Sequence, residues 1–337
     1  MVRSLRVLLL LVPALSSAQQ TPKSELVQSR MIWGRAPHNA YTDLVRFRDR
    51  WFCVFREGRL ASSSDGALRV LTSLDGEAWE SVAQVAGPDG DLREPKLSST
   101  PDGRLLLSAT ALAPGGIRHS LGWVSEDGRR WSPPQPIGEP GWVFGRVSWH
   151  LGRAYSLAFQ AAAPAPSRLY ASADGVRFSA HSETIAVPGE PTEASLLFLP
   201  DGNAFALLRR EGAAPTAMLG KSRSPFRAWT WAELNKGIAG PNLIRLPDGR
   251  LLAAGRIIDD TIRTSLCWID PEQETLSEFF ALRSSGDTGY PGLVYHDGYL
   301  WVSYYSSHEG KAMIYFAKVK LPPAVVKKAP GRLTFGD

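Results

Sequence analysis

The stretch "TPDGRLLLSA" (residues 100–109) joins a Pro-Asp-Gly turn to a continuous apolar run. A turn followed by an apolar run recurs as "FRDRWFCVF" at 47, "WHLGRAYSLAF" at 149, "LPDGNAFALL" at 199, "LPDGRLLAAG" at 246 and "YHDGYLWVSYY" at 295. Successive copies are 53, 49, 50, 47 and 49 residues apart. Six copies at a nearly constant spacing predict six repeats of one supersecondary unit.

A second marker falls between these turns, as "SLDGEAW" at 73, "SEDGRRW" at 125, "SADGVRF" at 172 and a relaxed "SRSPFRAW" at 222. In this pattern the Asp accepts hydrogen bonds from backbone N–H groups of its own turn, and the Gly takes a positive φ. The aromatic residue then folds under the turn and covers the blade. We therefore expect Trp79, Trp131 and Phe178 to be buried at the periphery and to have a structural role.

Each unit of about 50 residues holds several short runs of period two and no sustained helical pattern. One such unit fits a four-stranded antiparallel blade, and blades stacked radially cover each other's apolar faces. The sequence therefore predicts an all-β, six-bladed propeller. We expect a strand in "ELVQSRMIW" to pair with the last blade, so that the domain spans residues 19–320 and residues 321–337 form a loose C-terminal tail.

The chain has 337 residues, and its net charge of +5 comes from scattered lysines and arginines, which disfavours nucleic-acid binding. Arg3 and Arg6 precede the apolar run "VLLLLVPAL" and the small residues "SSA". This pattern predicts that residues 1–18 are a cleaved signal peptide. We expect a secreted or periplasmic monomer without a membrane span, because this run is too short to cross a bilayer. We expect Cys53 and Cys267 to be two separate buried residues rather than a disulfide. Neither a cofactor nor a metal-binding pattern is present, so none is expected.

The Ser-x-Asp-Gly-x-x-Trp markers resemble the Asp boxes (BNR repeats) of the sialidase, or neuraminidase, superfamily, over about residues 33–320. The resemblance implies a sialidase-like propeller. It also implies an exo-acting glycoside hydrolase that removes a terminal sialic acid or another acidic sugar from a glycan or glycoconjugate. The alternative is a non-catalytic propeller that binds glycans or proteins through the same central mouth, because fold alone does not decide function.

Two stretches carry the catalytic part of this resemblance. In "PTEASLLFLPDGNAFALLRREG", Glu193 and Arg209 match the sialidase arrangement of a Glu before one strand and an Arg at the end of the next. In "GYPGLVYHDG", Tyr290 matches the nucleophilic tyrosine. The resemblance implies that Glu193 removes the phenol proton, which a nucleophile with an ordinary pKa of about 10 requires. A neutral phenol also suits a sugar whose anomeric carbon bears a carboxylate, because an anionic nucleophile would be repelled.

The resemblance places the proton donor on the first blade, at Asp65 in "EGRLASSSDGALRV". That segment is also a good turn sequence. The substitutes are Asp91 and Glu94, in "DGDLREPKL" at the equivalent loop of the second blade.

The three-arginine clamp of sialidases is incomplete. The first arginine is replaced by Ala40, in "PHNAYTDLVRF". The third is Arg256, in "AAGRIIDD", or Arg263, in "TIRTSLCW", and Arg263 fits better because it opens a strand. Either another cation replaces the missing arginine or the pocket is rebuilt for a hydroxyl-bearing sugar. The cations near enough in sequence are Arg35, His38, Arg56 and Arg59.

Overall fold

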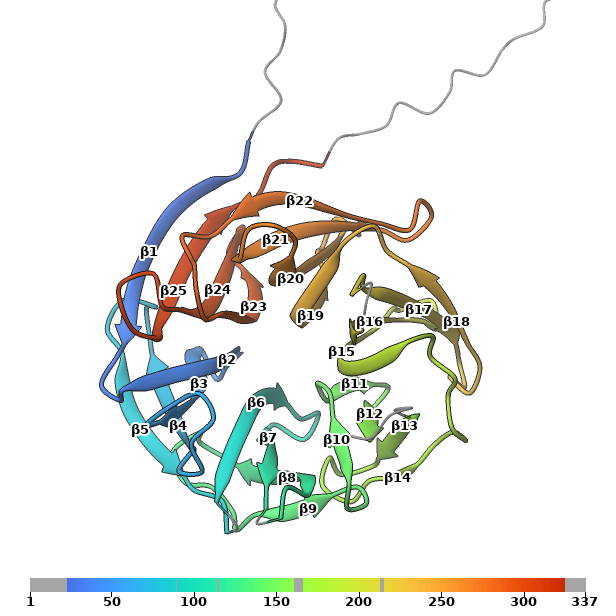
Figure 1. The fold of residues 1–337 in the computed structure, drawn as a ribbon, viewed down its shortest axis with the longest axis horizontal. Coiled ribbons are helices and arrows are strands. Elements are labelled where there is room, and N and C mark those ends of the chain that lie inside the picture. Colours follow the sequence, from blue (N-terminus) through green and yellow to red (C-terminus); the bar gives the residue numbers. More distant parts are fainter. Residues whose placement is uncertain (1–22, 89, 114, 161–165, 213–214, 325–337) are drawn as a thin grey trace, which may run out of the picture.

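The computed structural model describes residues 23–88, 90–113, 115–160, 166–212 and 215–324. The expected signal peptide and nearly all of the expected tail lie outside these residues. Six antiparallel sheets surround a central axis (Figure 1). The secondary structure found is strand only, and none of the described residues belongs to a helix that could cross a membrane. The predicted all-β, six-bladed propeller is confirmed.

In five blades the strands run outward from the axis in chain order, and in the sixth the N-terminal strand is added outside the last three. Blades one and two contain β2 (His38–Phe47), β3 (Arg50–Gly58), β4 (Ala67–Ser73), β5 (Glu80–Val85), β6 (Asp91–Ser99), β7 (Leu105–Leu112), β8 (Arg118–Ser125) and β9 (Gln135–Ile137). Blades three and four contain β10 (Trp142–Phe144), β11 (Ser148–His150), β12 (Arg153–Gln160), β13 (Ser167–Ser172), β14 (Ser179–Ala180), β15 (Glu190–Phe198), β16 (Asn203–Glu211), β17 (Met218–Arg223) and β18 (Trp229–Glu233). Blades five and six contain β19 (Gly237–Arg245), β20 (Leu251–Ile258), β21 (Arg263–Asp270), β22 (Thr275–Ala281), β23 (Thr288–His296), β24 (Tyr299–Ser306), β25 (Met313–Lys320) and β1 (Glu25–Trp33).

The N-terminal strand closes the ring. β1 pairs antiparallel with β25, from Glu25 opposite Lys320 to Trp33 opposite Ile314, and forms the outer strand of the sixth blade. In Figure 1 it lies along the rim, outside β25. This is the closure predicted from "ELVQSRMIW", and it joins the first and last segments of the domain in one sheet.

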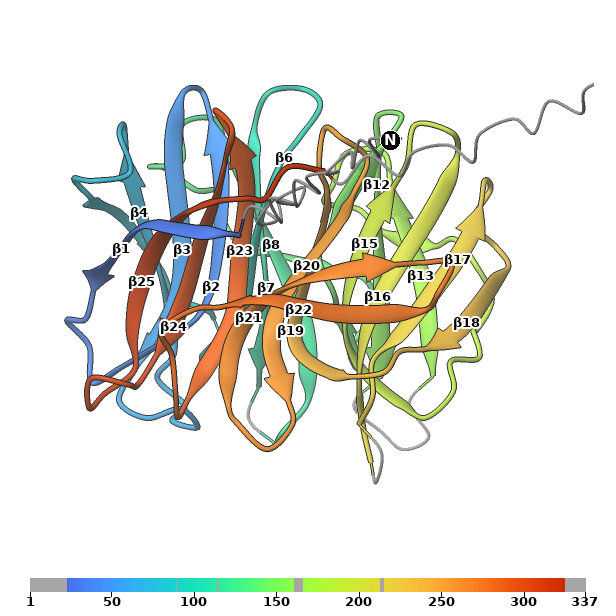
Figure 2. The ribbon, with the colours of Figure 1, turned by 90° about the horizontal axis from the view of Figure 1, so that it is seen from above.

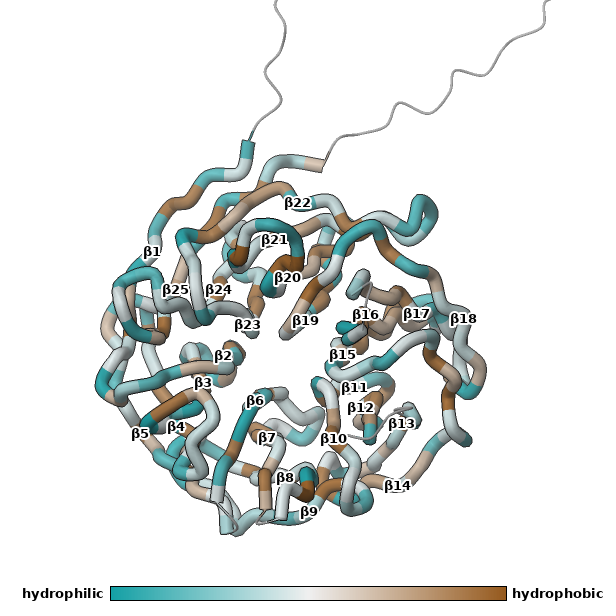
Figure 3. The backbone as a smooth tube through the Cα atoms, in the orientation of Figure 1, coloured by the Kyte–Doolittle hydropathy of each residue, from teal (hydrophilic) through white to brown (hydrophobic). Residues whose placement is uncertain are grey.

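The hydrophobic core lies between neighbouring blades. One cluster joins Phe52 and Val54 of blade one to Leu105 and Leu107 of blade two. The second strand of a blade is buried on both faces, which explains continuous apolar runs such as that of β7. Hydrophobic segments accordingly follow strands such as β19 and β20 in Figure 3. Cys53 and Cys267 are buried and unbridged, as predicted.

Both sequence markers lie at one end of the propeller, which is seen from the side in Figure 2. The six turn motifs join the first strand of each blade to the second, and the Asp-Gly markers join the third to the fourth. At residues 73–79, Asp75 Oδ1 accepts hydrogen bonds from the N–H groups of Glu77 and Ala78 at 2.7 and 3.0 Å, and Gly76 has φ = 79°. Trp79 donates from Nε1 to Gly76 O at 3.1 Å.

The marker aromatics are less buried than expected. Trp79, Trp131 and Phe178 are all half-buried, with one side open to solvent. They pack against the clusters beneath them rather than inside them, because the turn that carries them sits at the end of the blade.

Candidate active site

The opposite end of the propeller carries a ring of bulged inner strands. The register slips between Ala40 and Asp43 in β2, between Arg93 and Lys96 in β6, between Ala239 and Asn242 in β19 and between Gly289 and Gly292 in β23. β15 has a related slip between Pro191 and Glu193. A bulge leaves an extra residue unpaired and re-aims its side chain.

At four of these bulges, the first of the two residues between the paired positions has a positive φ. The values are 61° for Tyr41, 51° for Glu94, 59° for Gly240 and 46° for Tyr290. Side chains other than glycine rarely take this conformation, and such residues collect at functional sites. The strain at Tyr41, Glu94 and Tyr290 therefore marks the start of the inner strands as a specialised region.

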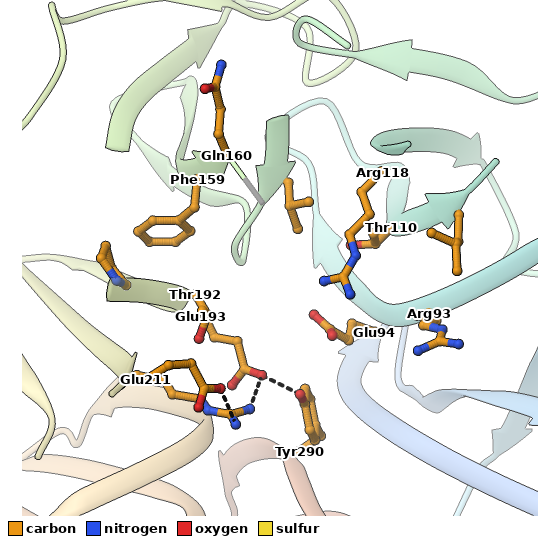
Figure 4. Close-up of a pocket in the computed structure, with 14 residues that line it drawn as sticks. Arg93, Glu94, Thr110, Arg118, Phe159, Gln160, Thr192, Glu193, Glu211 and Tyr290 are labelled. Carbon is orange, nitrogen blue, oxygen red and sulfur yellow. Dashed lines mark hydrogen bonds and ion pairs between the residues drawn. The ribbon is translucent and has the colours of Figure 1, made fainter. Parts of the chain in front are cut away.

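A cavity of about 180 Å³ opens at this end, near the axis. It is smaller than the roughly 300–1,000 Å³ of sites for drug-sized ligands, so it suits a small ligand. The lining comes mainly from blades two, three, four and six. It comprises Arg93, Glu94, Thr110, Leu112, Arg118, Val143, Phe159, Gln160, Pro191, Thr192, Glu193, Arg209, Glu211 and Tyr290 (Figure 4).

Tyr290 and Glu193 are in direct contact in this pocket. The Tyr290 hydroxyl donates a short hydrogen bond to Glu193 Oε1. Arg209 Nη1 donates to the same oxygen at 2.8 Å, and the Gly240 N–H donates to Oε2. Glu193 is therefore held by three donors. A guanidinium and a backbone N–H favour the ionised carboxylate, which is then able to accept the phenol proton.

Gly240 also makes room for the nucleophile candidate. A Cβ atom on residue 240 would lie 2.7 Å from Cγ of Tyr290. Burial, followed by the charges of Glu193 and Glu94, raises the pKa of Tyr290 well above its usual value. The free phenol consequently stays protonated at neutral pH, and it needs a base in contact to react.

A network of partly buried charges lies near the pocket. Arg146 makes a bidentate ion pair with Asp43, at 2.6 and 2.8 Å, across the ring from blade three to blade one. Lys96 lies in the same region, with its Nζ 5.3 Å from the centre of the Tyr290 ring and 3.4 Å from Glu94 O. Burial and the nearby charge of Arg146 lower the pKa of Lys96.

Glu94 faces Glu193 and Tyr290 from the second blade. Its carboxyl group is directed into the gap in Figure 4. Burial raises the pKa of Glu94, and repulsion by Glu193 raises it further, against the opposing charges of Lys96, Arg118 and Arg209. The pocket therefore contains one carboxylate bound by three donors and a second carboxyl group biased toward its protonated form.

Asp65 lies elsewhere. The structure places it on the exposed loop between β3 and β4, where it is paired with Arg59 at 3.0 Å, and it is not among the residues that line the pocket. Hydrogen bonds from Ser63 and from the Arg59 backbone lower the pKa of Asp65 to about 2. Asp91, the other substitute, is buried and bound by Arg56 at 2.8 Å and by Arg93.

Of the expected arginine clamp, Arg209 alone is found among the described lining residues. Arg263 is tied to Asp259 and Glu278 and is not among the lining residues. Arg256 lies beside Gly289. Arg56 is fully buried and bonded to Asp91 and to Leu60 O.

The remaining candidates lie around blade one. His38 Nε2 contacts Asp287 Oδ2 at 2.8 Å, and Arg59 holds Asp65. Arg35 stacks on Trp33, with its guanidinium carbon 4.4 Å from the ring centre. Each of these cations therefore already has a partner outside the pocket.

Two pocket arginines, Arg93 and Arg118, were not foreseen. Both come from the second blade, and Figure 4 shows them on the same side of the pocket as Glu94. A sequence signal for this region does exist. The segments "EPKL" at 94, "GPNL" at 240 and "YPGL" at 290 share the pattern x-Pro-x-Leu at multiples of the blade spacing. In each of them the first residue has a positive φ.

No metal cluster is found at the site. In the part of the chain that the structure describes, no group of three or more His, Cys, Asp or Glu residues is placed to hold a metal ion.

Solved structures of other proteins share this fold. No protein-family model matches the sequence, and no curated protein does. A protein of unknown function from Dyadobacter fermentans is 21% identical with a TM-score of 0.78, covering 89% of this chain and 100% of that one. The Penicillium chrysogenum α-L-arabinanase complexed with arabinobiose is 13% identical with a TM-score of 0.69, covering 90% and 100%.

The Trypanosoma rangeli sialidase in complex with the inhibitor DANA is also similar, at 12% identity and a TM-score of 0.65. The match covers 88% of this chain and 60% of that one. At these identities the likeness establishes the fold. The chain is a six-bladed propeller of the type found in sialidases and α-L-arabinanases.

Proposed function

We propose that this protein is an exo-acting glycoside hydrolase, which removes a terminal sugar from a glycan or glycoconjugate in the central pocket. Tyr290 is the nucleophile and Glu193 its base. The observation that carries the proposal is the hydrogen bond from the Tyr290 hydroxyl to Glu193, whose carboxylate is fixed by Arg209 and Gly240. A propeller that only bound glycans would not need a phenol joined to an oriented carboxylate.

The chemistry follows from this contact. The Tyr290 oxygen bonds to the anomeric carbon while its proton passes to Glu193, and the bond to the leaving-group oxygen breaks. Water then cleaves the bond between tyrosine and sugar, and the phenol regains its proton. Two displacements of this kind retain the anomeric configuration, and a tyrosine nucleophile is a known exception among glycosidases.

We propose an acidic sugar, sialic acid or another, as the group removed. Arg93, Arg118 and Arg209 bring three guanidinium groups to the pocket, and guanidinium groups bind carboxylates well. The neutral phenol also avoids repulsion by a carboxylate on the anomeric carbon. On the basis of the signal-peptide pattern in residues 1–18, we propose that the protein acts outside the cytoplasm. We also propose that it is a monomer.

A neutral sugar is the second candidate. Ala40, at the position of the first clamp arginine, is fully buried, and Arg93 and Arg209 already pair with Asp91, Glu193 and Glu211. Less positive charge is then left for a substrate carboxylate. A pocket of this kind suits a sugar recognised through its hydroxyl groups.

The test is a panel of aryl glycosides that includes a sialoside, a glucuronide and an arabinofuranoside. On the substrate that the wild type cleaves, Tyr290→Phe removes only the attacking oxygen. We expect kcat to fall by several powers of ten, about the loss seen when a nucleophile is removed, while the thermal melting curve changes little. Full activity of Tyr290→Phe contradicts the nucleophile. No cleavage by the wild type contradicts the enzyme and favours a binding propeller.

A further inference from the structure

The reaction proposed above requires a proton donor for the leaving-group oxygen. Such a donor must be protonated at the working pH and must reach the scissile bond. Asp65 has neither property in this structure. It is exposed, it is paired with Arg59 at 3.0 Å, and it lies outside the pocket lining.

Glu94 has the required position. It lies at the bulge of β6, with φ = 51°, as Tyr290 lies at the bulge of β23 with φ = 46°. These equivalent bulges direct both side chains into one pocket from different blades. Glu94 lines both the open cavity and an adjoining smaller cavity, which also touches Lys96, Gly240 and Tyr290. A sugar that contacts Tyr290 would therefore have Glu94 beside it.

Glu193 and Glu94 differ in the groups that surround their carboxyl groups, and this difference gives them different roles. Arg209 and the Gly240 N–H donate to Glu193, whereas no described residue donates a hydrogen bond to the carboxyl group of Glu94. Burial and the nearby charge of Glu193 raise the pKa of Glu94. When two carboxyl groups share a site, the one held by donors serves as the base and the one kept protonated serves as the acid.

We propose that Glu94, from the second blade, is the acid/base catalyst of the hydrolysis. In the first step it gives its proton to the glycosidic oxygen as that oxygen leaves and the Tyr290 oxygen bonds to the anomeric carbon. In the second step the Glu94 carboxylate takes a proton from the attacking water, and it returns to its starting state. This assignment rests on the proposed glycosidase function.

Glu94→Gln tests the assignment with two glycosides of whichever sugar the panel identifies. A dinitrophenyl group leaves without protonation, whereas a benzyl alcohol needs a proton. We expect kcat/KM of Glu94→Gln to fall about 100- to 10,000-fold on the benzyl glycoside, the usual value of a general acid, and far less on the dinitrophenyl glycoside. In the smaller Glu94→Ala variant, added azide restores turnover of the dinitrophenyl glycoside and forms a glycosyl azide of retained configuration.

Asp65→Asn is measured in parallel because it represents the competing assignment. If Asp65→Asn rather than Glu94→Gln shows the dependence on the leaving group, the proposal is overturned. It is also overturned if Glu94→Gln loses both activities equally while its melting curve stays that of the wild type. A wild type that cleaves neither glycoside refutes the proposed function itself, and that outcome is distinct from both.

Discussion

At the scale of single residues, the environment that we propose makes Glu94 an acid catalyst also lowers the stability of the folded chain when Glu94 is ionised. Its raised pKa means that the folded chain holds the Glu94 proton at pH values where the unfolded chain has released it. The contribution of Glu94 to the stability of the wild type therefore falls as the pH rises from the ordinary glutamate value of about 4.3 through the folded pKa. Glutamine keeps the uncharged form at every pH.

We expect Glu94→Gln to gain stability relative to the wild type as the pH rises, with little difference near pH 4 and the largest difference above the folded pKa of Glu94. Urea unfolding at a series of pH values measures this. The exposed Glu183→Gln is the matched control and should show no such trend. Parallel curves for the wild type and Glu94→Gln would mean that Glu94 ionises like a surface glutamate.

The sequence could identify some site residues and not others. Tyr290, Glu193 and Arg209 stand in local patterns that the resemblance to sialidases covers, and the structure brings all three together. Arg93, Arg118 and Lys96 were missed because their placement depends on the bulge in β6 and on the distance between blades. Arg263 looked suitable because it opens a strand. Its side chain is held by Asp259 and Glu278, however, and does not line the pocket, a local pairing that the strand pattern does not show.

At the scale of the element, the Asp-Gly marker turn is a local support for its blade. Trp131 is half-buried against the cluster between blades one and two, and its Nε1 has no hydrogen-bond partner among the described residues. It lies at the end of the strands opposite to Tyr290. Its contribution should therefore be apolar packing, without a part in catalysis.

Trp131→Ala should lower the free energy of unfolding by about 1.5–3 kcal/mol, the value of a large apolar side chain, and less than the roughly 3–5 kcal/mol of a fully buried tryptophan. Trp131→Phe should stay close to the wild type, because it keeps a ring and loses no hydrogen bond. Urea unfolding gives both values. Catalytic loss in Trp131→Ala with unchanged stability would show that the turn belongs to a binding site.

The bulges are the element-scale feature that periodicity alone cannot predict. An alternating pattern fixes which side chains face the neighbouring blades, but an extra residue in a strand changes this alternation locally. Blade three shows the same limit. Its inner strand is split into β10 and β11, and Arg146 between them turns to Asp43 of blade one. The sequence predicted one inner strand for each repeat and gave no sign of this break.

At the scale of the whole molecule, the spacing of the turns predicted the number of blades, because each blade must repeat the same hairpins. It also predicted the closing strand, since "ELVQSRMIW" had no blade of its own. What spacing could not supply is the depth of the pocket, which depends on side chains from four blades meeting near the axis.

Removing residues 25–33 should destabilise the sixth blade, because β25 would lose its pairing with β1 along its length and expose an unpaired edge. We expect a lower and broader thermal transition, together with self-association in size-exclusion chromatography. Activity should also fall, since the same blade carries Tyr290. A shortened chain that melts like the full one would show that the ring closes without β1.

The pairing of β1 with β25 also sets an order in time. A ribosome makes β1 first, yet its partner emerges only after five complete blades and most of the sixth. Until then the earliest segment of the domain has no sheet to join, and β24 and β23 have no finished neighbour. The pairing therefore unites the first and last strands of the domain and can form only once β25 has been made, so a nascent chain that stalls before β25 carries a β1 strand without its partner.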